Sequence, residues 1–313
     1  MLENIAGVYT PLLSGGVVVI LPADDVGVNL ENTNNGGLNV QKMLDALMIY
    51  RANTAVLTPE LLLALTSRLE DMATEDKATT THLRFLAVGG ASVSPSLLAR
   101  AHEIGLPVFE GYGLSECCSV VALNTEQQSK MGSAGKLLPH VRLQFTKGGE
   151  ILAQGATLLG YTNQPKPLDT YYPTGDIGRL DADGYLYIIG RKKNMFITSF
   201  GRNVSPEWVE RELKVSPFIT QAILFGEAKP WNTLIVTPSK NALSVQIQTA
   251  IDAVNANLPD YARVNKWFIA DTPFSKANSQ LTVNGRLRRE AIWQQYQSKI
   301  NALYQTDLAT HLH

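Results

Sequence analysis

The sequence has few cysteines and histidines and lacks long apolar runs. Its two cysteines, Cys117 and Cys118, are neighbours, so they cannot form the disulfide framework of a secreted fold. Its five histidines are scattered without metal-ligand spacing. No run of about 18 apolar residues occurs, and no basic segment precedes an apolar core at the N-terminus. We therefore expect no membrane span and no signal peptide, and we expect a cytoplasmic protein.

The composition is that of an ordinary globular protein. Hydrophobic residues make up 45% of the 313 residues and charged residues 18%, which excludes disorder and collagen-like repeats. The length corresponds to roughly two domains at about 100–200 residues each. No internal repeat is visible.

The net charge of −1 hides a division along the chain. Residues 1–185 carry 12 Lys and Arg against 19 Asp and Glu, whereas residues 186–313 carry 15 against 9. The basic C-terminal part could bind phosphates, or it could pack against the acidic N-terminal part of the same chain. No basic run with interleaved aromatics occurs, so we expect no nucleic-acid partner.

The first half alternates between expected helices and strands. Helices are expected at 2–13, 41–50, 59–68 and 95–104, and strands at 17–21, 54–57, 84–88 and 107–110. Apolar strands that alternate with helices predict a parallel sheet covered on both faces.

The pattern changes after about Ser133. Short segments separated by Gly and Asp-Gly turns predict a small antiparallel β unit that ends at Ile189, with Asp183-Gly184 as a hairpin turn. Further on, a helix at 206–213, strands at 221–225 and 233–237 and two more helices predict a compact α+β unit. The domain boundary is expected near residue 190.

Three segments combine turn glycines with reactive side chains. Val88-Gly-Gly-Ala-Ser92 lies between a strand and a helix, where glycines let the backbone approach a ligand. Glu110-Gly-Tyr-Gly-Leu-Ser-Glu116 follows a strand and holds an aromatic ring, a hydroxyl and a carboxylate. Tyr171-Tyr-Pro-Thr-Gly-Asp176 presents a carboxylate that could accept both hydroxyls of a ribose. Each segment alone could equally be a structural turn.

In this order, the motifs resemble those of the adenylate-forming enzyme superfamily, which comprises acyl-CoA synthetases, peptide-synthetase adenylation domains and luciferases. The matching segments cover roughly residues 85–290. They are Gly89-Gly-Ala91, Tyr112-Gly-Leu-Ser-Glu116, Gly149-Glu-Ile151 with Gly160-Tyr161, Thr174-Gly-Asp176, Gly190-Arg191, Gly201-Arg-Asn-Val-Ser-Pro-Glu207 and Asn284-Gly-Arg286. The residues of these motifs are most similar to those of the fatty or aryl acyl-CoA synthetase branches.

The resemblance implies a two-step reaction. A fatty or aromatic carboxylate attacks the α-phosphate of ATP and expels pyrophosphate, and a thiol, typically CoA, then takes the acyl group from acyl-AMP. It also implies residue roles. Tyr112 would stack on adenine, Gly89, Gly90 and Ala91 would line the adenine and acyl pockets, Gly113 and Ser115 would lie along the nucleotide with Ser115 on phosphate, and Asp176 and Arg191 would hold the ribose hydroxyls.

Three further roles follow from the resemblance. Glu116 would hold Mg²⁺. Lys193 would be the hinge about which a C-terminal lobe rotates between the half-reactions, and Gly201 would border the tunnel for the thiol arm of CoA. Such chemistry depends largely on positioning and charge neutralisation.

Two departures from the family pattern bear on activity. The Ser/Thr/Gly-rich phosphate loop is not found in this sequence, so we expect a piece of a longer protein, with only part of the usual N-terminal lobe. The catalytic C-terminal Lys is replaced by Arg286, a larger planar cation that is not its equivalent. Both departures lead us to expect that this chain alone is inactive in adenylation and does not form acyl-AMP from ATP at a useful rate.

The expected fold class is α/β: a partial N-terminal AMP-binding lobe over 1–189, with a small β subdomain over about 133–189, a hinge over 190–200, and a mobile α+β lobe over 201–313. The expected function is that of an acyl-CoA synthetase. Two alternatives stay open: a nucleotide- or acyl-binding protein without turnover, and an adenylation module that loads a carrier protein. Peripheral association with a membrane is also left open.

Overall fold

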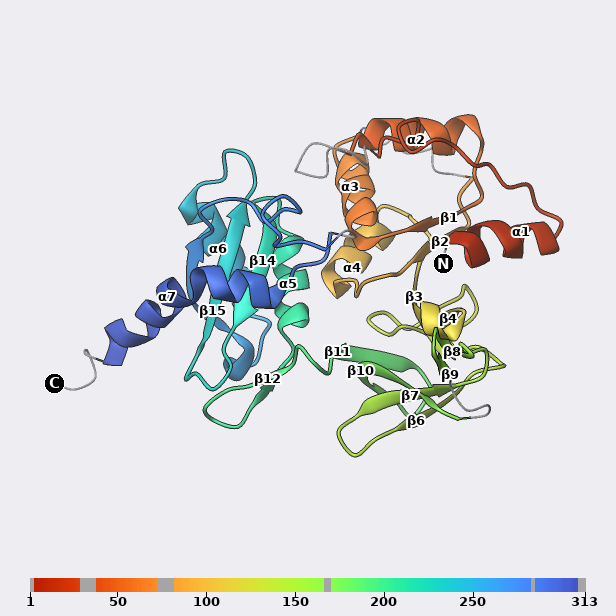
Figure 1. Cartoon of the computed structure of the whole chain (residues 1–313). Helices are drawn as coiled ribbons and strands as arrows, with labels where there is room; N and C mark the ends of the chain where they lie inside the picture. The colour runs from red at the N-terminus through yellow and green to blue at the C-terminus, as the bar shows by residue number, and fades with distance from the viewer. Residues whose placement is uncertain (1–2, 29–37, 73–81, 166–169, 283–284, 309–313) are drawn as a thin grey trace. The chain divides into compact units, whose positions relative to one another are not determined.

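The computed structural model describes residues 3–28, 38–72, 82–165, 170–282 and 285–308. The chain divides into two compact units (Figure 1). The first ends at Lys193 and the second begins at Asn194. Among the described residues, no helix is long and apolar enough to cross a bilayer.

The first unit begins with the expected helical segment, a π-helix over Glu3–Tyr9 that continues as α1, Thr10–Leu13. The expected strand at 17–21 does not form. Those residues have no regular structure, and Val17 and Ile20 are 90% and 77% exposed. An apolar β-branched run becomes a strand only when a neighbouring strand pairs with it, and none pairs with this one in the described chain.

The next part of this unit is a mixed sheet with strand order β1-β2-β3-β4-β5. The strands are β1 Thr54–Leu57, β2 Phe85–Val88, β3 Val108–Leu114, β4 Ser119–Leu123 and β5 Lys136–Leu137, and the helices are α2 Val40–Ile49, α3 Pro59–Glu70 and α4 Pro95–Glu103. β1, β2 and β3 are parallel, as predicted, whereas β3, β4 and β5 are antiparallel. The three helices begin with proline in the first turn or an Asn N-cap, as expected for helix starts.

β3 is longer than predicted and belongs to both halves of this sheet. Its first residues pair with β2 up to Glu110, and its last residues, from Gly111, pair with β4. The segment expected to be a loop after a strand is therefore mostly strand. Gly113 makes this pairing possible, because a Cβ there would lie 1.6 Å from the carbonyl oxygen of Ser119.

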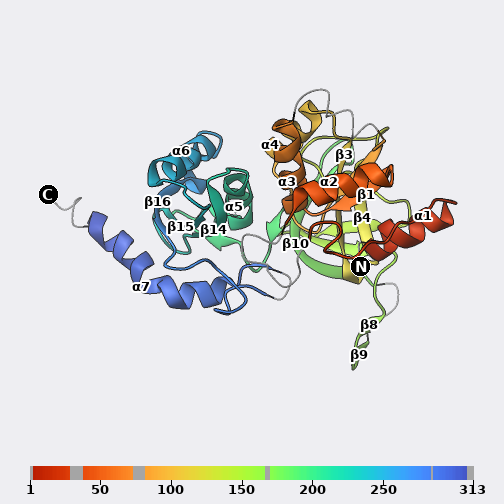
Figure 2. The ribbon, with the colours of Figure 1, turned by 90° about the horizontal axis from the view of Figure 1, so that it is seen from above.

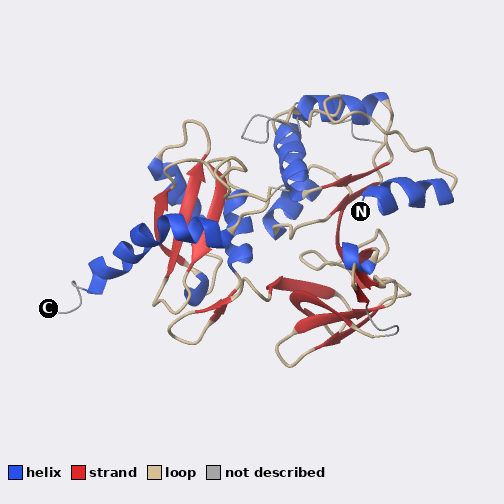
Figure 3. Ribbon diagram, in the orientation of Figure 1, coloured by secondary structure: helices blue, strands red, loops and turns tan. Residues whose placement is uncertain are grey.

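The predicted antiparallel β unit is present, and Figure 3 draws its strands in red. Its strand order is β11-β10-β7-β6. Its strands are β6 Arg142–Phe145, β7 Glu150–Gln154, β10 Tyr172–Leu180 and β11 Leu186–Arg191, and a small hairpin joins β8 Gly160–Tyr161 to β9 Gln164–Pro165. The turn at Asp183-Gly184 connects β10 to β11, as expected. β11 continues through Gly190 and Arg191, so the strand ends later than Ile189.

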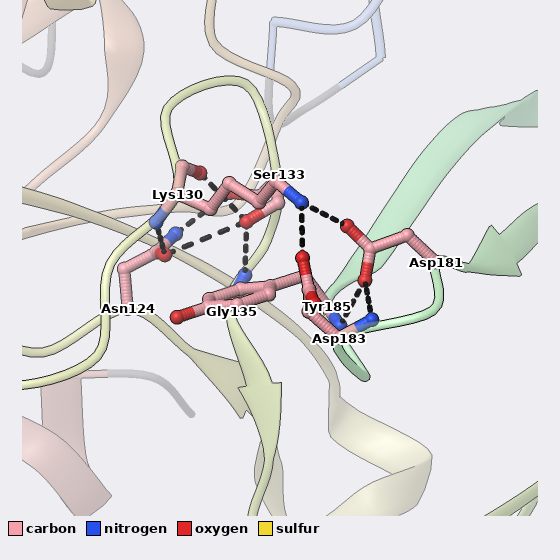
Figure 4. Close-up of polar contacts among 7 residues, drawn as sticks. All are labelled: Asn124, Lys130, Ser133, Gly135, Asp181, Asp183 and Tyr185. Carbon is pink, nitrogen blue, oxygen red and sulfur yellow. Dashed lines mark hydrogen bonds and ion pairs between the residues drawn. The ribbon is translucent and has the colours of Figure 1, made fainter.

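A polar network holds this hairpin against the loop that follows β4 (Figure 4). Lys130 Nζ lies 2.7 Å from Asp181 and 2.9 Å from Asp183. Asn124 accepts from the Lys130 backbone at 2.9 Å and donates to the Ser133 carbonyl at 2.6 Å. The network joins the two sheets of the first unit near their loops.

The second unit is built on the sheet β14-β15-β16. Its elements are β12 Phe196–Ile197, β13 Asn203–Val204, α5 Pro206–Lys214, β14 Ile219–Phe225, β15 Asn232–Pro238, α6 Ser244–Asn255, β16 Val264–Ile269 and α7 Arg289–Leu308. One face of the sheet packs its apolar side chains against α5 and α6, and the other packs against α7 (Figure 2). The strand β16 was not expected.

Candidate functional site

The first candidate segment, Gly89–Ala91, leaves the sheet at the carboxyl end of β2. Val88 pairs with Glu110, so the segment begins beside the point where β3 runs on through Gly111. Gly89 is buried and donates its N–H to the Leu57 carbonyl at 3.2 Å, whereas Gly90 and Ala91 are exposed. Exposed backbone at the carboxyl edge of parallel strands is the usual place for a ligand in an α/β sheet.

Asp176 is the centre of the most connected part of the site. It lies on β10 directly opposite Arg191 on β11, and its carboxylate Oδ1 is 3.0 Å from Arg191 Nε. Arg191 Nη1 also donates to the Thr174 carbonyl at 2.9 Å. Asp176 is only 5% exposed. Arg191 compensates its negative charge in this buried position. The expected turn aspartate is thus a strand residue with structural partners.

Tyr112 joins this pair from the other sheet of the unit. Its hydroxyl donates to Asp176 Oδ2 at 2.6 Å. Burial raises the pKa of the Tyr112 phenol and the negative charge of Asp176 raises it further, so the phenol remains a protonated donor at neutral pH. The structure therefore brings together Tyr112, Asp176 and Arg191, three of the residues singled out from the sequence.

The glycine before Asp176 has a specific conformational task. Gly175 has φ of +73°, in the left-handed region that side chains rarely adopt. Its carbonyl accepts the backbone N–H of Lys192 at 2.9 Å. The Thr-Gly-Asp motif is thus an irregular place in β10. The register to β7 shifts across it, between Pro173 and Ile177, and the register to β11 shifts just after it, between Ile177 and Gly178.

Glu116 lies in a short 3₁₀ turn, Ser115–Cys117, at the end of β3. Its Oε1 accepts a hydrogen bond of 2.8 Å from the hydroxyl of Tyr161, which lies 3.3 Å from the hydroxyl of Tyr172. Ser115 is exposed. In the sequence, Tyr161 stands out only as part of a Gly-Tyr motif. A motif of two residues cannot reveal the contact of Tyr161 with Glu116.

The backbone after Glu116 is in sparsely populated conformations. Cys118 and Ser119 have φ of +51° and +92°, which non-glycine residues rarely adopt. Such backbone conformations cost free energy and cluster at functional sites. They turn the chain back into β4, which begins at Ser119, three residues after Glu116.

The part of the chain that the structure describes does not surround Glu116 with a complete set of protein metal ligands. Among the residues described, no group of three or more His, Cys, Asp or Glu side chains could hold a metal ion. A single carboxylate nevertheless suits Mg²⁺, which proteins commonly bind through one or two carboxylates together with substrate phosphates.

The first unit ends in a residue with two fixed neighbours. Lys192 Nζ forms an ion pair of 2.7 Å with Glu150, and Asn194, in the second unit, donates to Glu207 of the same unit. Lys193 between them is exposed. Gly190 and Arg191, the first residues of the expected hinge, belong to β11.

Gly201 and Arg286 both lie on turns of the second unit. Gly201 is in the turn between β12 and β13, where Thr198 donates its N–H to the Arg202 carbonyl at 3.0 Å. Arg286 is an exposed residue of a hairpin in which Leu281 pairs with Leu287. Asn284 of the same motif lies outside the described residues.

Comparison with known proteins identifies the family and the fold class of this chain. Residues 1–160 match the family profile described as AMP-binding enzyme, and residues 193–308 match the profile described as AMP-binding enzyme C-terminal domain. The long-chain-fatty-acid–CoA ligase FadD15 of Mycobacterium bovis is 30% identical over 246 residues, which cover 69% of this chain and 41% of that protein. The indoleacetate–CoA ligase of Aromatoleum aromaticum is 29% identical, over 72% of this chain and 45% of that protein.

Solved structures share the fold. The O-succinylbenzoate CoA synthetase of Bacillus subtilis in complex with AMP has a TM-score of 0.70 at 21% identity, over 92% of this chain and 58% of that chain. The anthranilate CoA ligase AuaEII in complex with anthranoyl-AMP also has a TM-score of 0.70, at 17% identity, over 98% of this chain and 58% of that chain. This chain therefore spans about half the length of the proteins it matches.

Proposed function

Since this chain belongs to the family of AMP-binding enzymes, we propose that it carries the chemistry of an acid–thiol ligase. A fatty or aromatic carboxylate attacks the α-phosphate of ATP, pyrophosphate leaves, and the product is acyl-AMP. The thiol of CoA then attacks the acyl carbon, AMP leaves, and a thioester forms. The ligase names of the similar proteins support this reaction class. We also propose a cytoplasmic location for this protein.

The carboxylate of Asp176 is the observation that carries the proposal. Arg191 contacts one of its oxygens and Tyr112 the other, which holds the carboxylate in one orientation. An ionised carboxylate only accepts hydrogen bonds, at about four lone-pair positions, and therefore suits hydroxyl donors. The two hydroxyls of a ribose match this arrangement. We propose that Asp176 and Arg191 bind the ribose of the adenylate.

The adenine and phosphates would lie along β2 and β3. We propose that the ring of Tyr112 stacks on adenine while its hydroxyl stays on Asp176, and that Gly89, Gly90 and Ala91 line the base and acyl pocket. Gly113 keeps the backbone of β3 against β4 here. Ser115, at the exposed end of β3, would donate to a phosphate oxygen.

Glu116 is the residue we propose for Mg²⁺. Tyr161 engages one oxygen of the carboxylate, which leaves the other oxygen to meet a cation. Bound Mg²⁺ would supply positive charge to the phosphates of ATP. Tyr161 keeps the Glu116 side chain in place for this contact.

The thiol step and the domain rotation involve the boundary between the units. We propose Lys193 as the hinge, because residues on both sides of it are bound within their own unit. The turn with Gly201 would border the arm of CoA. A carrier protein with the same thiol arm is the alternative acceptor.

Arg286 favours a second candidate function, nucleotide and acyl binding with little adenylation. A Lys at this position, as in the family, would place a compact ammonium beside the negative charge that develops on the leaving pyrophosphate. The planar guanidinium of Arg286 does not reproduce that geometry. Losing one preorganised donor typically costs about 10²–10³ in rate. The transfer of an acyl group from preformed acyl-AMP depends less on this residue.

Two assays in parallel test the proposal. ATP–pyrophosphate exchange measures adenylation, and thioester formation from synthetic dodecanoyl-AMP or benzoyl-AMP with CoA measures acyl transfer. We expect acyl transfer to exceed exchange, and Arg286→Lys to raise exchange without raising transfer. Tight binding of acyl-AMP without transfer to CoA would support the binding function, and transfer only to a carrier protein would identify the other acceptor. No binding of AMP or acyl-AMP by calorimetry would contradict both functions.

A further inference from the structure

The start of α7 is fixed to the sheet of the second unit by an ion pair between a buried carboxylate and a half-buried guanidinium. The guanidinium of Arg289, the first residue of α7, contacts the carboxylate of Glu210 on α5. Its Nη1 also donates to the Leu224 carbonyl of β14 at 2.9 Å. The same Glu210 oxygen accepts the Leu224 N–H at 2.7 Å. Three elements, α5, β14 and α7, therefore meet at one buried point.

The hairpin that bears Arg286 is directly connected to this point. Thr282 donates its N–H to the Arg286 carbonyl at 2.8 Å, and the Arg286 N–H donates to Thr282 Oγ1 at 3.0 Å. The Arg288 N–H donates to the Gln280 carbonyl at 2.8 Å. These bonds join the two sides of the hairpin. Its apolar residues Leu281 and Leu287 pack against the core cluster that includes Ile223 of β14, and Arg289 adds a polar contact to β14 and α5.

We propose that Glu210 and Arg289 are positioning residues that set the direction in which the hairpin presents Arg286. The proposal rests on the function proposed above, in which Arg286 presents its positive charge to the phosphates of ATP. α5 begins at Pro206, a few residues after Gly201. The same pair thereby links the element that follows the Gly201 turn to the hairpin of Arg286.

The chemistry of the pair fits a positioning role better than a stabilising one. A buried ion pair is often no more stabilising than well-packed apolar side chains of similar size, but it demands a defined geometry. Arg289 can meet both the carboxylate and the Leu224 carbonyl because its guanidinium is a rigid planar fork. Burial raises the pKa of Glu210, and the charge of Arg289 opposes that rise.

The direct test replaces both partners together. A single substitution would leave one buried charge without its partner and could unfold the unit. The double variant Glu210→Met with Arg289→Met keeps the volume and removes both charges. Lys299→Met is the matched control, because Lys299 lies on α7 like Arg289 and forms an exposed ion pair, with Asp271.

The readout is the backbone ¹⁵N order parameter of residues 285–288. In the double variant we expect these values to fall below about 0.6, the range of flexible backbone, while β14 stays near about 0.85. In Lys299→Met we expect wild-type values throughout. Unchanged order parameters at 285–288 in a folded double variant would overturn the proposal. If the double variant does not fold, the pair is structural and the proposal is equally overturned.

A second readout separates this inference from the proposed function. If the pair acts through Arg286, the double variant should lower kcat of ATP–pyrophosphate exchange and leave the KM for ATP near the wild-type value. The same double change in an Arg286→Ala background should then lower kcat no further. A further loss in that background would show that the pair acts by another route. A mobile hairpin together with an Arg286→Ala variant of normal exchange activity would keep the positioning and reject the role of Arg286.

Discussion

The hydroxyl of Tyr112 donates a 2.6 Å hydrogen bond to Asp176, which lies 64 positions later in the chain. The bond runs from β3 of the mixed sheet to β10 of the antiparallel sheet. The aromatic ring and the carboxylate proposed to bind the two halves of a nucleoside are therefore held by each other before any ligand arrives. Preorganisation of this kind lowers the cost of binding.

Asp176→Ala should weaken both AMP binding and folding. The substitution removes the charge that compensates Arg191 and leaves the Tyr112 hydroxyl without its acceptor. Lost charge-assisted hydrogen bonds cost about 2–3 kcal/mol in affinity. Calorimetry with AMP measures this loss, and the melting temperature should fall as well. Asp183→Ala, an exposed hairpin carboxylate of the same unit, should bind AMP normally. Unchanged affinity of Asp176→Ala would remove the ribose assignment.

Tyr112→Phe separates the ring from the hydroxyl. Losing the hydrogen bond to Asp176 should lower the free energy of unfolding by about 1 kcal/mol. Because the ring remains, AMP binding should weaken only a few-fold, whereas Tyr112→Ala should weaken it much more. Titration calorimetry on the two variants gives the comparison. Equal losses of AMP affinity in Tyr112→Phe and Tyr112→Ala would mean that the ring does not stack on the base.

Acid should release the contact between Lys130 and Asp181. The hydrogen bond from Lys130 lowers the pKa of Asp181 from its ordinary 3.8 to about 2. A lowered pKa in the folded state means that the contact stabilises the fold fully above about pH 4 and loses this effect as the pH falls toward 2. A ¹³C NMR titration of the Asp181 carboxyl should show the low value in the wild type and a higher one in Lys130→Met.

The control for this titration is Lys136→Met. Lys136 lies over the ring of Tyr185, as Lys130 does, but its Nζ makes no ion pair with Asp181. We expect the wild-type titration in this variant. An equal rise of the Asp181 pKa in both variants would show that general charge, rather than the direct contact, sets the value.

Limited trypsin treatment should first cut the chain after Lys193. This residue is exposed between the two units, and segments between packed units open at low cost. The cut should release a C-terminal piece of about 120 residues, identifiable by mass spectrometry. Glu150→Gln frees the side chain of Lys192 and should increase cleavage after that residue. First cuts within residues 210–290 would contradict the hinge at Lys193.

Much of the fold follows from local patterns in the sequence. The helix starts at Pro59 and Pro95, the parallel strands and the Asp183-Gly184 turn all depend on neighbouring residues and were predicted. The strand expected at 17–21 depends on pairing with another strand, which residue type cannot reveal. The strand Val264–Ile269 has a mixed sequence, Val-Asn-Lys-Trp-Phe-Ile, without alternation, so it was missed.

The site residues were recognised by motif, but their contacts with one another were not. Motif order identified Tyr112, Asp176 and Arg191 as separate contacts to a nucleotide. The hydrogen bond from Tyr112 and the pairing of Asp176 with Arg191 depend on how two sheets meet and on a shift of register in β10. The contact of Tyr161 with Glu116 and the pair Glu210–Arg289 join distant segments in the same way. Single-sequence patterns carry no signal for such long-range contacts.

The exposed run at 17–21 has a consequence for how this chain behaves in concentrated solution. No charged residue occurs between Glu3 and Asp24, and strand-forming side chains such as Val17 and Ile20 face water. Unpaired segments of this composition adhere to one another edge to edge, and natural proteins prevent this with lysines at such positions. The chain should therefore tend to associate through this run at high concentration, even while both units are folded.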